Sequence, residues 1–246
     1  MHEKHIFALS YHDYSQVLKN QTSSNIIALT DEKLTHRIIR VLRLTIGDKI
    51  ILFDNQIHSC LVIESYDKKK LILSIEYIKS NTFHLPRINI LLPILKQSHL
   101  EEAIYSLTEL GASSIQLIKT EKTQIKWQDK ELDRLRKIAI GAAEQSKNYI
   151  FPEIFAPISF IQACQNNYSH CFFFDPEGIS PLNIILKLGN DKQTTITLLV
   201  GPAGDLTSKE KEQLQSSNFT FLHLTPTILQ AHHAIALACG IFRTLL

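Results

Sequence analysis

The stretch Leu198-Leu199-Val200-Gly201-Pro202-Ala203-Gly204-Asp205-Leu206-Thr207-Ser208-Lys209-Glu210 carries the most information about the fold. It begins with an apolar run, typical of a buried strand, that ends in a Gly-Pro-x-Gly turn. Thr207 and Glu210 have the Ser/Thr-x-x-Glu spacing of a capping box, which predicts a helix start. A strand, a tight turn and a helix N-terminus place backbone N–H groups at the carboxyl edge of a sheet, where open α/β proteins hold small ligands.

The turn differs from the common nucleotide loops. The chain contains neither Gly-x-Gly-x-x-Gly nor Gly-x-x-x-x-Gly-Lys-Ser/Thr, which disfavours a nicotinamide-dependent or phosphate-transfer enzyme. A Gly-Pro-x-Gly turn by itself also fits a simple connection between two elements. Its meaning therefore depends on the motifs around it.

Length and composition exclude several classes of protein. The 246 residues are 44% hydrophobic, which is enough for a substantial core. With 26 basic and 24 acidic residues, the balance argues against coating a bulk polyanion but allows a local basic patch. The four cysteines form no Cys-x-x-Cys pair, so we expect a reducing compartment and no zinc site. Residues 1–5 lack a signal peptide's apolar stretch, and the chain has no membrane-length apolar run, so we predict a cytoplasmic protein.

The pattern changes near residue 80. Residues 1–80 contain short strand-like runs separated by turns, which suggest a small β-barrel or sandwich, with one helix over 31–42. Residues 81–246 alternate strands and helices, which predicts a parallel sheet with helices on both faces. The strands expected there lie at 88–92, 115–118, 171–174, 195–200 and 219–222. Ser98 and Glu101 predict a capped helix that stops at Gly111, and two more helices are expected over 133–147 and from Ala234 to Leu245.

Six motifs, in order along the chain, resemble the RsmE family, the 16S ribosomal RNA uracil-N3 methyltransferases of the SPOUT superfamily. They span about residues 4–245, and no single one is decisive. They are Leu42-Arg43-Leu44 with Gly47-Asp48 and Leu52-Phe53-Asp54; Leu95-Lys96 with Thr108-Glu109-Leu110-Gly111; Thr120-Glu121-Lys122-Thr123; Ala142-Ala143-Glu144-Gln145-Ser146 with Pro152-Glu153-Ile154; Val200-Gly201-Pro202-x-Gly204; and Leu224, Pro226, Ile228-Leu229 and Ala234.

The resemblance implies an architecture and an activity. Residues 1–80 would form a PUA-like β-barrel that binds RNA, and residues 81–246 a SPOUT α/β domain with a C-terminal trefoil knot. The implied activity is S-adenosylmethionine-dependent methylation of N3 of a specific uridine in 16S ribosomal RNA, on the small ribosomal subunit. The family also implies a homodimer with its sites near the interface. The chemistry requires no metal, so we expect none.

The resemblance and the residue chemistry together suggest site residues. Lys96 follows the first strand of the α/β part, where a cation could touch phosphate or the uracil. His232 and His233 could serve as a general base, because imidazole titrates near neutrality. For RNA we expect Arg37, Arg40, Arg43 and Lys96, with Arg37 and Arg40 at i and i+3 on one helix face. The cofactor walls would be Val200, Gly201, Pro202 and Gly204, and Leu222, His223, Leu224, Thr225, Ile228 and Leu229.

The chain departs from the family pattern at several of these positions. Ala203 replaces a glutamate, Asp205 a glycine, and Thr227, Gln230 and Asn148 three arginines; Thr225, Ala231, His232 and His233 replace Gly, Thr, Glu and Thr. Thr and Gln cannot replace a charged bidentate fork. The departures leave a second hypothesis open, a divergent SPOUT-fold RNA-binding protein with lost or altered methyltransferase activity. The catalytic base stays unassigned.

Overall fold

The chain divides into two compact units. The computed structural model describes residues 5–20, 25–166, 168–189 and 194–246. One unit comprises Met1–Thr82 with Glu144–Ile150, and the other Phe83–Ala143 with Phe151–Leu246. A single cut at residue 80 does not capture this division, because the segment 144–150 belongs with the first unit. Each unit has its own apolar core.

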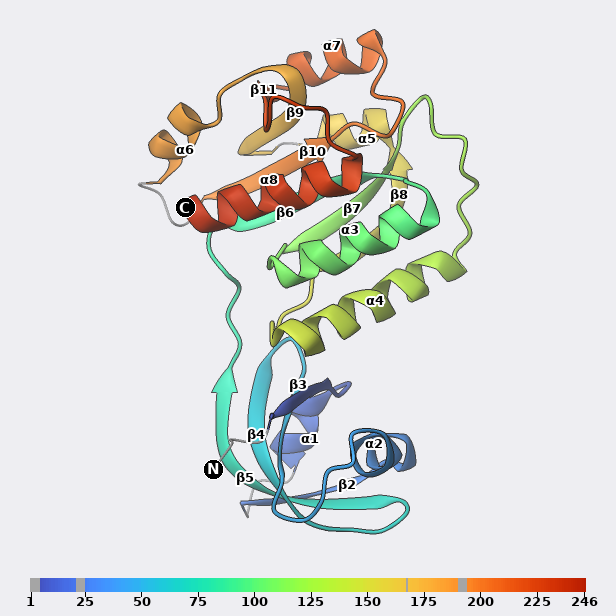
Figure 1. The fold of residues 1–246 in the computed structure, drawn as a ribbon, viewed down its shortest axis with the longest axis vertical. Coiled ribbons are helices and arrows are strands. Elements are labelled where there is room, and N and C mark those ends of the chain that lie inside the picture. The colour runs from blue at the N-terminus through green and yellow to red at the C-terminus, as the bar shows by residue number, and fades with distance from the viewer. Residues whose placement is uncertain (1–4, 21–24, 167, 190–193) are drawn as a thin grey trace. The chain divides into compact units, whose positions relative to one another are not determined.

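The first unit is built around a five-stranded sheet (Figure 1). Its strand order is β1-β3-β4-β5-β2, with β1 parallel to β3 and the other neighbours antiparallel. Short strands were predicted for this part of the chain, and Ile27, Ile50, Leu61 and Leu71 fill the core beneath them. The elements are β1 (Phe7–Ser10), α1 (Tyr14–Asn20), β2 (Ile26–Thr30), α2 (Glu32–His36), the π-helix η1 (Arg37–Val41), β3 (Lys49–Phe53), β4 (Ile57–Tyr66) and β5 (Lys70–Ser80).

The predicted helix over 31–42 differs from the observed one. Asp31 caps it, because its Oδ1 accepts a hydrogen bond from the Leu34 N–H at 2.9 Å. The α-helix then gives way to the π-helix η1, in which the Leu42 N–H donates to the Arg37 carbonyl five residues back. A π-turn is wider than an α-turn, so Arg37 and Arg40 are spaced differently around the helix axis than in the predicted α-helix.

The returning segment is fastened to the first unit by side chains. The Glu144 carboxylate accepts the Ser10 N–H at 2.9 Å and both arms of the Arg37 guanidinium at 3.0 and 2.5 Å. Tyr149 stacks on His58 with ring centroids 4.2 Å apart. Arg37, expected as an RNA contact, is therefore occupied by a bidentate ion pair.

The second unit is a parallel sheet, as predicted, but it has six strands where the sequence predicted five. Its order is β11-β9-β10-β6-β7-β8. The elements are β6 (Arg87–Pro93), α3 (Gln97–Glu109), β7 (Ser114–Lys119), α4 (Lys130–Ser146), β8 (Glu153–Ser159), α5 (Phe160–Gln165), β9 (His170–Ile179), α6 (Leu182–Leu188), β10 (Thr195–Val200), α7 (Ser208–Ser216), β11 (Thr220–Leu222) and α8 (Ala231–Leu245).

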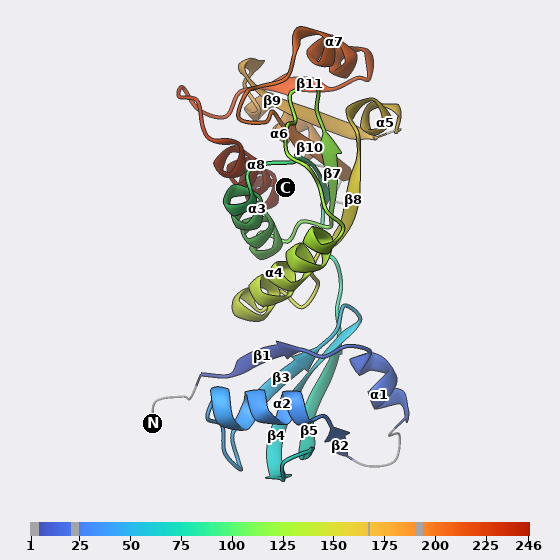
Figure 2. The same cartoon turned by 90° about the vertical axis from the view of Figure 1, so that its right-hand side faces the viewer.

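Helices cover both faces of this sheet, as Figure 2 shows. Because side chains alternate along a strand, Leu198 faces one layer and Leu199 the other. On the first face the strands pack against α3 and α8, through residues such as Leu107 and Phe242. On the second face they pack against α5 and α7, with Leu214 as one contact.

The helix starts test the capping predictions. Thr207 and Glu210 form the predicted capping box of α7. The box predicted at Ser98 is wrong, because α3 begins one residue earlier, at Gln97, with Lys96 as its N-cap. The Glu101 carboxylate instead pairs with Arg134 at 2.8 Å. The sequence analysis did not predict α1, β8, α5 and α6, although Ser159 and Gln162 form a capping box at the start of α5.

Candidate cofactor and RNA site

Several loops with predicted site residues meet at one edge of the parallel sheet. β6 ends at Pro93, β10 at Val200 and β11 at Leu222, and parallel strands have their carboxyl ends on the same side. Lys96, the loop 201–207 and the loop 223–230 therefore all leave the sheet at this edge. This is where open α/β sheets bind ligands.

The loop after β10 is a tight turn in which Asp205 lies close to Gly201. Asp205 has φ 56°, in the left-handed region, and its N–H donates to the Pro202 carbonyl at 2.9 Å. The Asp205 Oδ1 accepts the Leu206 N–H at 2.7 Å. A Cβ on Gly201 would lie only 2.8 Å from that Oδ1. Any side chain at Gly201 would therefore have to displace the aspartate.

Lys211 of α7 holds this loop to β9. Its Nζ lies 2.6 Å from the Asp175 Oδ2 and 2.8 Å from the Asp205 Oδ2. Burial alone would raise the pKa of Asp175, but the Lys211 ammonium and the Glu177 N–H outweigh it and hold the pKa below its usual value. Burial alone would lower the pKa of Lys211, but its hydrogen bonds to the Asp175 and Asp205 carboxylates outweigh burial and raise the pKa.

The loop after β7 also contacts the loop after β10. The Lys122 Nζ donates to the Gly204 carbonyl at 2.7 Å. The Glu121 N–H donates to Glu210 at 2.8 Å, and the Thr207 hydroxyl donates to the Glu121 carboxylate at 3.1 Å. Sequence reasoning gave no site role to Lys122, Glu121 or Lys211. For Glu121 and Lys122 the sequence did offer a signal, because residues 120–123 form one of the six matched motifs.

The second predicted wall begins where β11 crosses close to β9. A Cβ on Gly178 would lie 2.4 Å from the Leu222 carbonyl carbon, so only glycine permits this approach. The His223 Nδ1–H donates to the Gly178 carbonyl at 3.0 Å. The Thr225 hydroxyl donates to the Thr227 carbonyl at 2.6 Å and closes a turn. Leu224 and Leu229 are half-buried, and Ile228 is 86% exposed.

The candidate catalytic residues fall into two environments. Lys96 is exposed at the start of α3, at the carboxyl end of β6. His232 is only 5% exposed, and its Nε2 lies 3.2 Å from the Glu102 carboxylate. His233 is exposed on the first turn of α8.

The predicted RNA-binding arginines lie in the first unit. Arg40 and Arg43 are exposed, and Arg43 adopts a left-handed conformation with φ 56° just after η1. Arg37 is half-exposed but is held by Glu144. Arg40 and Arg43 therefore offer the more available charges for phosphate.

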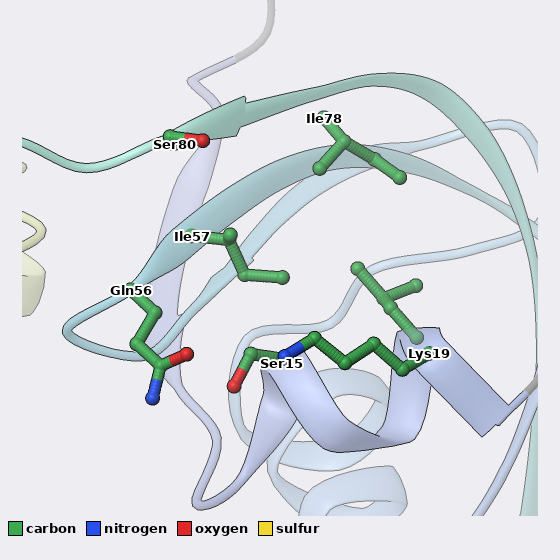
Figure 3. Close-up of a pocket in the computed structure, with 7 residues that line it drawn as sticks. Ser15, Lys19, Gln56, Ile57, Ile78 and Ser80 are labelled. Carbon is green, nitrogen blue, oxygen red and sulfur yellow. The ribbon is translucent and has the colours of Figure 1, made fainter.

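A depression of about 440 Å³ in the first unit lies outside all predicted site residues (Figure 3). It is lined by Ser15, Leu18, Lys19, Gln56, Ile57, Ile78 and Ser80. The residues that line it do not form a convergent set of catalytic groups. Among the residues that the structure describes, no helix combines the length and apolar composition needed to cross a membrane.

Comparison with known proteins agrees with this arrangement. The family described as "RNA methyltransferase domain" matches residues 83–243, and the "RNA methyltransferase PUA domain" matches 29–76. Ribosomal RNA small subunit methyltransferase E 2 of Borreliella burgdorferi is 28% identical, over 93% of this chain and 95% of the relative. Ribosomal RNA small subunit methyltransferase E of Bacillus subtilis is 29% identical, over 84% and 85%.

A solved structure shares the fold. The crystal structure of the Neisseria gonorrhoeae small subunit methyltransferase E, bound to S-adenosyl methionine, has a TM-score of 0.81 with 21% identity, and covers 98% of each chain. The two domains and the loop edge thus define an RNA methyltransferase with an N-terminal PUA domain. The chain belongs to this family, and within it to the RsmE family that its motifs resemble.

Proposed function

We propose that this chain transfers a methyl group from S-adenosylmethionine to N3 of a uridine in 16S ribosomal RNA, acting on the small ribosomal subunit in the cytoplasm. The observation that carries the proposal is the RNA methyltransferase match over residues 83–243, whose loops gather at one sheet edge. The small-subunit names of the relatives support the RNA target. The PUA domain supports RNA binding by the first unit.

The residues at the edge fit such a cofactor. When bound, S-adenosylmethionine supplies an electrophilic methyl group on a sulfonium. Val200, Gly201, Pro202 and Gly204 would form one wall, and 222–225 with Ile228 and Leu229 the other. The fit rests on main-chain approach: Gly201 leaves room beside the Asp205 carboxylate, and the Gly178 contact fixes the start of the second loop. Small residues in tight turns expose the N–H and C=O groups that read an adenine edge.

The chain's own residues must make the uracil anion accessible. For the uracil N3 to accept a methyl group, a base must take its proton, and nearby groups must stabilise the negative charge that the ring then carries. We propose that Lys96, exposed at the end of β6, stabilises the negative charge on the uracil or holds its phosphate. We assign no base role to His232, because it is buried and paired with Glu102.

The resemblance also suggests a knot and a homodimer, which we include in the proposal. The loop 223–230 and α8 would thread the chain end through the sheet-edge loops. Exposed apolar side chains support association, since α8 presents Leu237 at 38% exposure, α3 presents Tyr105 at 36%, and Ile228 precedes α8. Analytical ultracentrifugation gives the mass: a monomer at micromolar concentration would contradict the dimer.

The alternative is an RNA-binding protein that has lost methyl transfer. The exposed Thr227 and Gln230, which stand where the family has arginines, motivate it. Calorimetry with S-adenosylmethionine and transfer of labelled methyl to small-subunit RNA separate the two functions. Methyl incorporation that mass mapping places on a uridine N3 supports the enzyme. Tight, salt-sensitive RNA binding without cofactor binding or incorporation supports the alternative.

A variant pair tests the role of Lys96. Lys96→Ala should lower the single-turnover rate about 100-fold if Lys96 stabilises the anion, as removal of one oxyanion-hole donor does. It should instead weaken RNA binding and reduce its salt slope by about one if Lys96 contacts phosphate. Lys137→Ala, which removes an exposed lysine of α4, is the matched control. Equal behaviour of the two variants would remove Lys96 from the site.

A further inference from the structure

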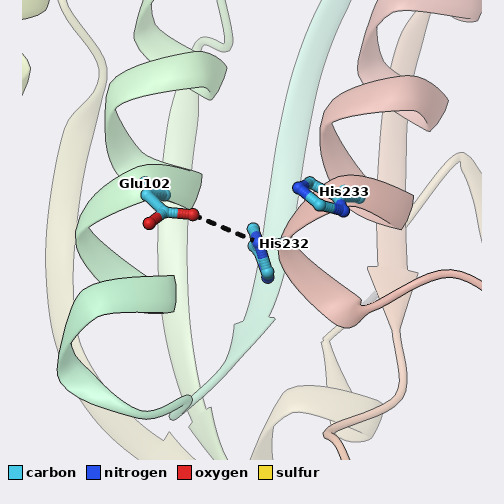
Figure 4. A group of neighbouring side chains, drawn as sticks. All are labelled: Glu102, His232 and His233. Carbon is cyan, nitrogen blue, oxygen red and sulfur yellow. Dashed lines mark ion pairs between the residues drawn. The ribbon is translucent and has the colours of Figure 1, made fainter.

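Four titratable side chains meet where α3 packs on α8. His99 and Glu102 lie one turn apart on α3, and His232 and His233 are the second and third residues of α8. The His232 ring stacks on the His99 ring with centroids 4.3 Å apart, and it is tilted against the His233 ring with centroids 4.1 Å apart. Figure 4 shows Glu102 and His233 on opposite sides of His232.

Three of these residues bring ligand atoms together. One nitrogen from each of His232 and His233 and one carboxylate oxygen of Glu102 lie within 4.8 Å of one another. The Glu102 Oε2 is 3.2 Å from the His232 Nε2. Tetrahedral zinc with ligand bonds of about 2.0–2.1 Å separates neighbouring ligand atoms by roughly 3.3 Å. The Glu102–His232 pair therefore already has the spacing of one edge of such a site.

The remaining adjustment falls on mobile side chains. Glu102 is 59% exposed and His233 is exposed, so both can turn, whereas His232 is buried and fixed by its stacking. Burial lowers the pKa of His232, and the neighbouring His233 and His99 lower it further against the opposing effect of Glu102.

The protein itself leaves His232 incompletely satisfied. Its Nδ1 is buried without a hydrogen-bond partner. With its proton on Nε2, His232 can donate to the Glu102 carboxylate. A cation between Nε2 and Glu102 would take the position of that proton and bond to both residues. Two imidazoles and one carboxylate suit Zn²⁺ and its neighbours in the first transition row, while Mg²⁺ and Ca²⁺ prefer oxygen ligands.

We propose that Glu102, His232 and His233 form a binding site for a first-row transition-metal cation, Zn²⁺ above all, with the fourth position open to water. The site would clamp the start of α8 to α3, directly after the loop 223–230. It is separate from the expectation that methyl transfer needs no metal, and it does not rest on the proposed function. His99 lies over the His232 ring and would shield the metal-bound imidazole from one side.

The test uses untagged full-length protein and metal alone. Titration with Co²⁺ should give the d–d absorption bands of a tetrahedral N/O site that saturate at one equivalent per chain, and excess Zn²⁺ should abolish them. His233→Gln and Glu102→Gln remove exposed ligands and should each weaken Zn²⁺ binding at least tenfold, since even changes to the partners of metal ligands cost about 10- to 100-fold. His36→Gln, at an exposed histidine of α2, is the matched control and should bind as the parent does.

Two results would overturn the proposal. One is Zn²⁺ affinity that is the same in the parent, His233→Gln and Glu102→Gln, which would place the metal on other histidines. The other is the absence of tetrahedral Co²⁺ bands at one equivalent. Circular dichroism verifies that the variants fold, and the nitrogen shifts of the imidazoles in the parent give an independent measurement. Zn²⁺ should move those of His232 and His233, and unmoved shifts would count against the site.

Discussion

Lys211 joins Asp205 of the loop 201–207 to Asp175 of β9, and replacing it with methionine tests how much each of the two pairs contributes to stability. Methionine keeps most of the aliphatic stem, so the loss is electrostatic. Asp175 is 6% exposed, and without Lys211 its charge would stay buried with the Glu177 N–H as its remaining bond in this cluster. A hydrogen bond between charged groups in such a place contributes about 1.5–3 kcal/mol. Asp205 is 55% exposed, and solvent screening limits that pair to about 0.2–1 kcal/mol.

Double-mutant cycles separate the two contributions. We expect Lys211→Met to lower the free energy of unfolding by about 2–4 kcal/mol, from the sum of both pairs. The coupling energy of Lys211→Met with Asp175→Asn should exceed that with Asp205→Asn. Urea unfolding followed by circular dichroism gives each value, and the denaturant dependence should not change. Coupling below about 0.5 kcal/mol to Asp175, or a larger coupling to Asp205, would refute the reasoning.

Three further predictions concern other contacts. Glu144→Gln should destabilise the first unit by about 1–2 kcal/mol in urea unfolding, because Glu144 accepts hydrogen bonds from Ser10 and from the half-exposed Arg37. Glu32→Gln, at an exposed glutamate, is the control, and an equal loss of stability in the two variants would contradict this. Burial would raise the pKa of Asp54, but hydrogen bonds from the N–H groups of Ser15, Ile57 and Gln56 lower it below the unfolded value. Its stabilisation should therefore be complete above that value and be lost as pH falls through the folded pKa, and Asp54→Asn should flatten the acid limb of stability against pH. All four cysteines are buried, and burial raises the pKa of Cys239 to about 12, so native protein at pH 8 should alkylate far more slowly than protein in urea; one fast-reacting native thiol would disprove this.

The sequence correctly predicted features that depend on contacts between residues close together in the chain. The capping boxes show the limit of this: Thr207 and Glu210 satisfy each other within four residues, and their helix starts where expected. Ser98 and Glu101 have the same spacing, but Glu101 pairs with Arg134, and the Leu100 N–H bonds to the Lys96 carbonyl, so the helix begins earlier. A long-range partner overrode a local pattern there.

The missed elements gave weak periodic signals. β8 is an edge strand, and only Ile154 of its seven residues is buried, so it lacks the alternation of a half-buried strand. α1 and α6 have seven residues each, too short for a helical period to stand out. The return of 144–150 to the first unit depends on Glu144 meeting Arg37, 107 residues away, and no pattern within either segment indicates that contact.

In the candidate site, too, the sequence predicted the local features but not the contacts between distant elements. The turn at Gly201 and the helix start at Thr207 follow from the sequence, because glycine and a capping pair act locally. The residues that hold the turn, Lys211 and Lys122, come from other elements. Their role depends on the order of strands in the sheet, which places β9 beside β10. Six ordered motifs indicated the family, but their residues alone did not give these contacts.

The departures from the family pattern are of two physical kinds. Asp205 and His232 have acquired partners: Asp205 binds the Leu206 N–H and Lys211, and His232 meets Glu102 and His99. Thr227 and Gln230 are exposed, and they stand where the family pattern has arginines that could hold phosphate or stabilise an anionic uracil. Loss of an exposed cation weakens RNA contact without disturbing main-chain recognition of a cofactor. The substitutions therefore bear more on how this chain holds its RNA than on whether its sheet edge can hold the methyl donor.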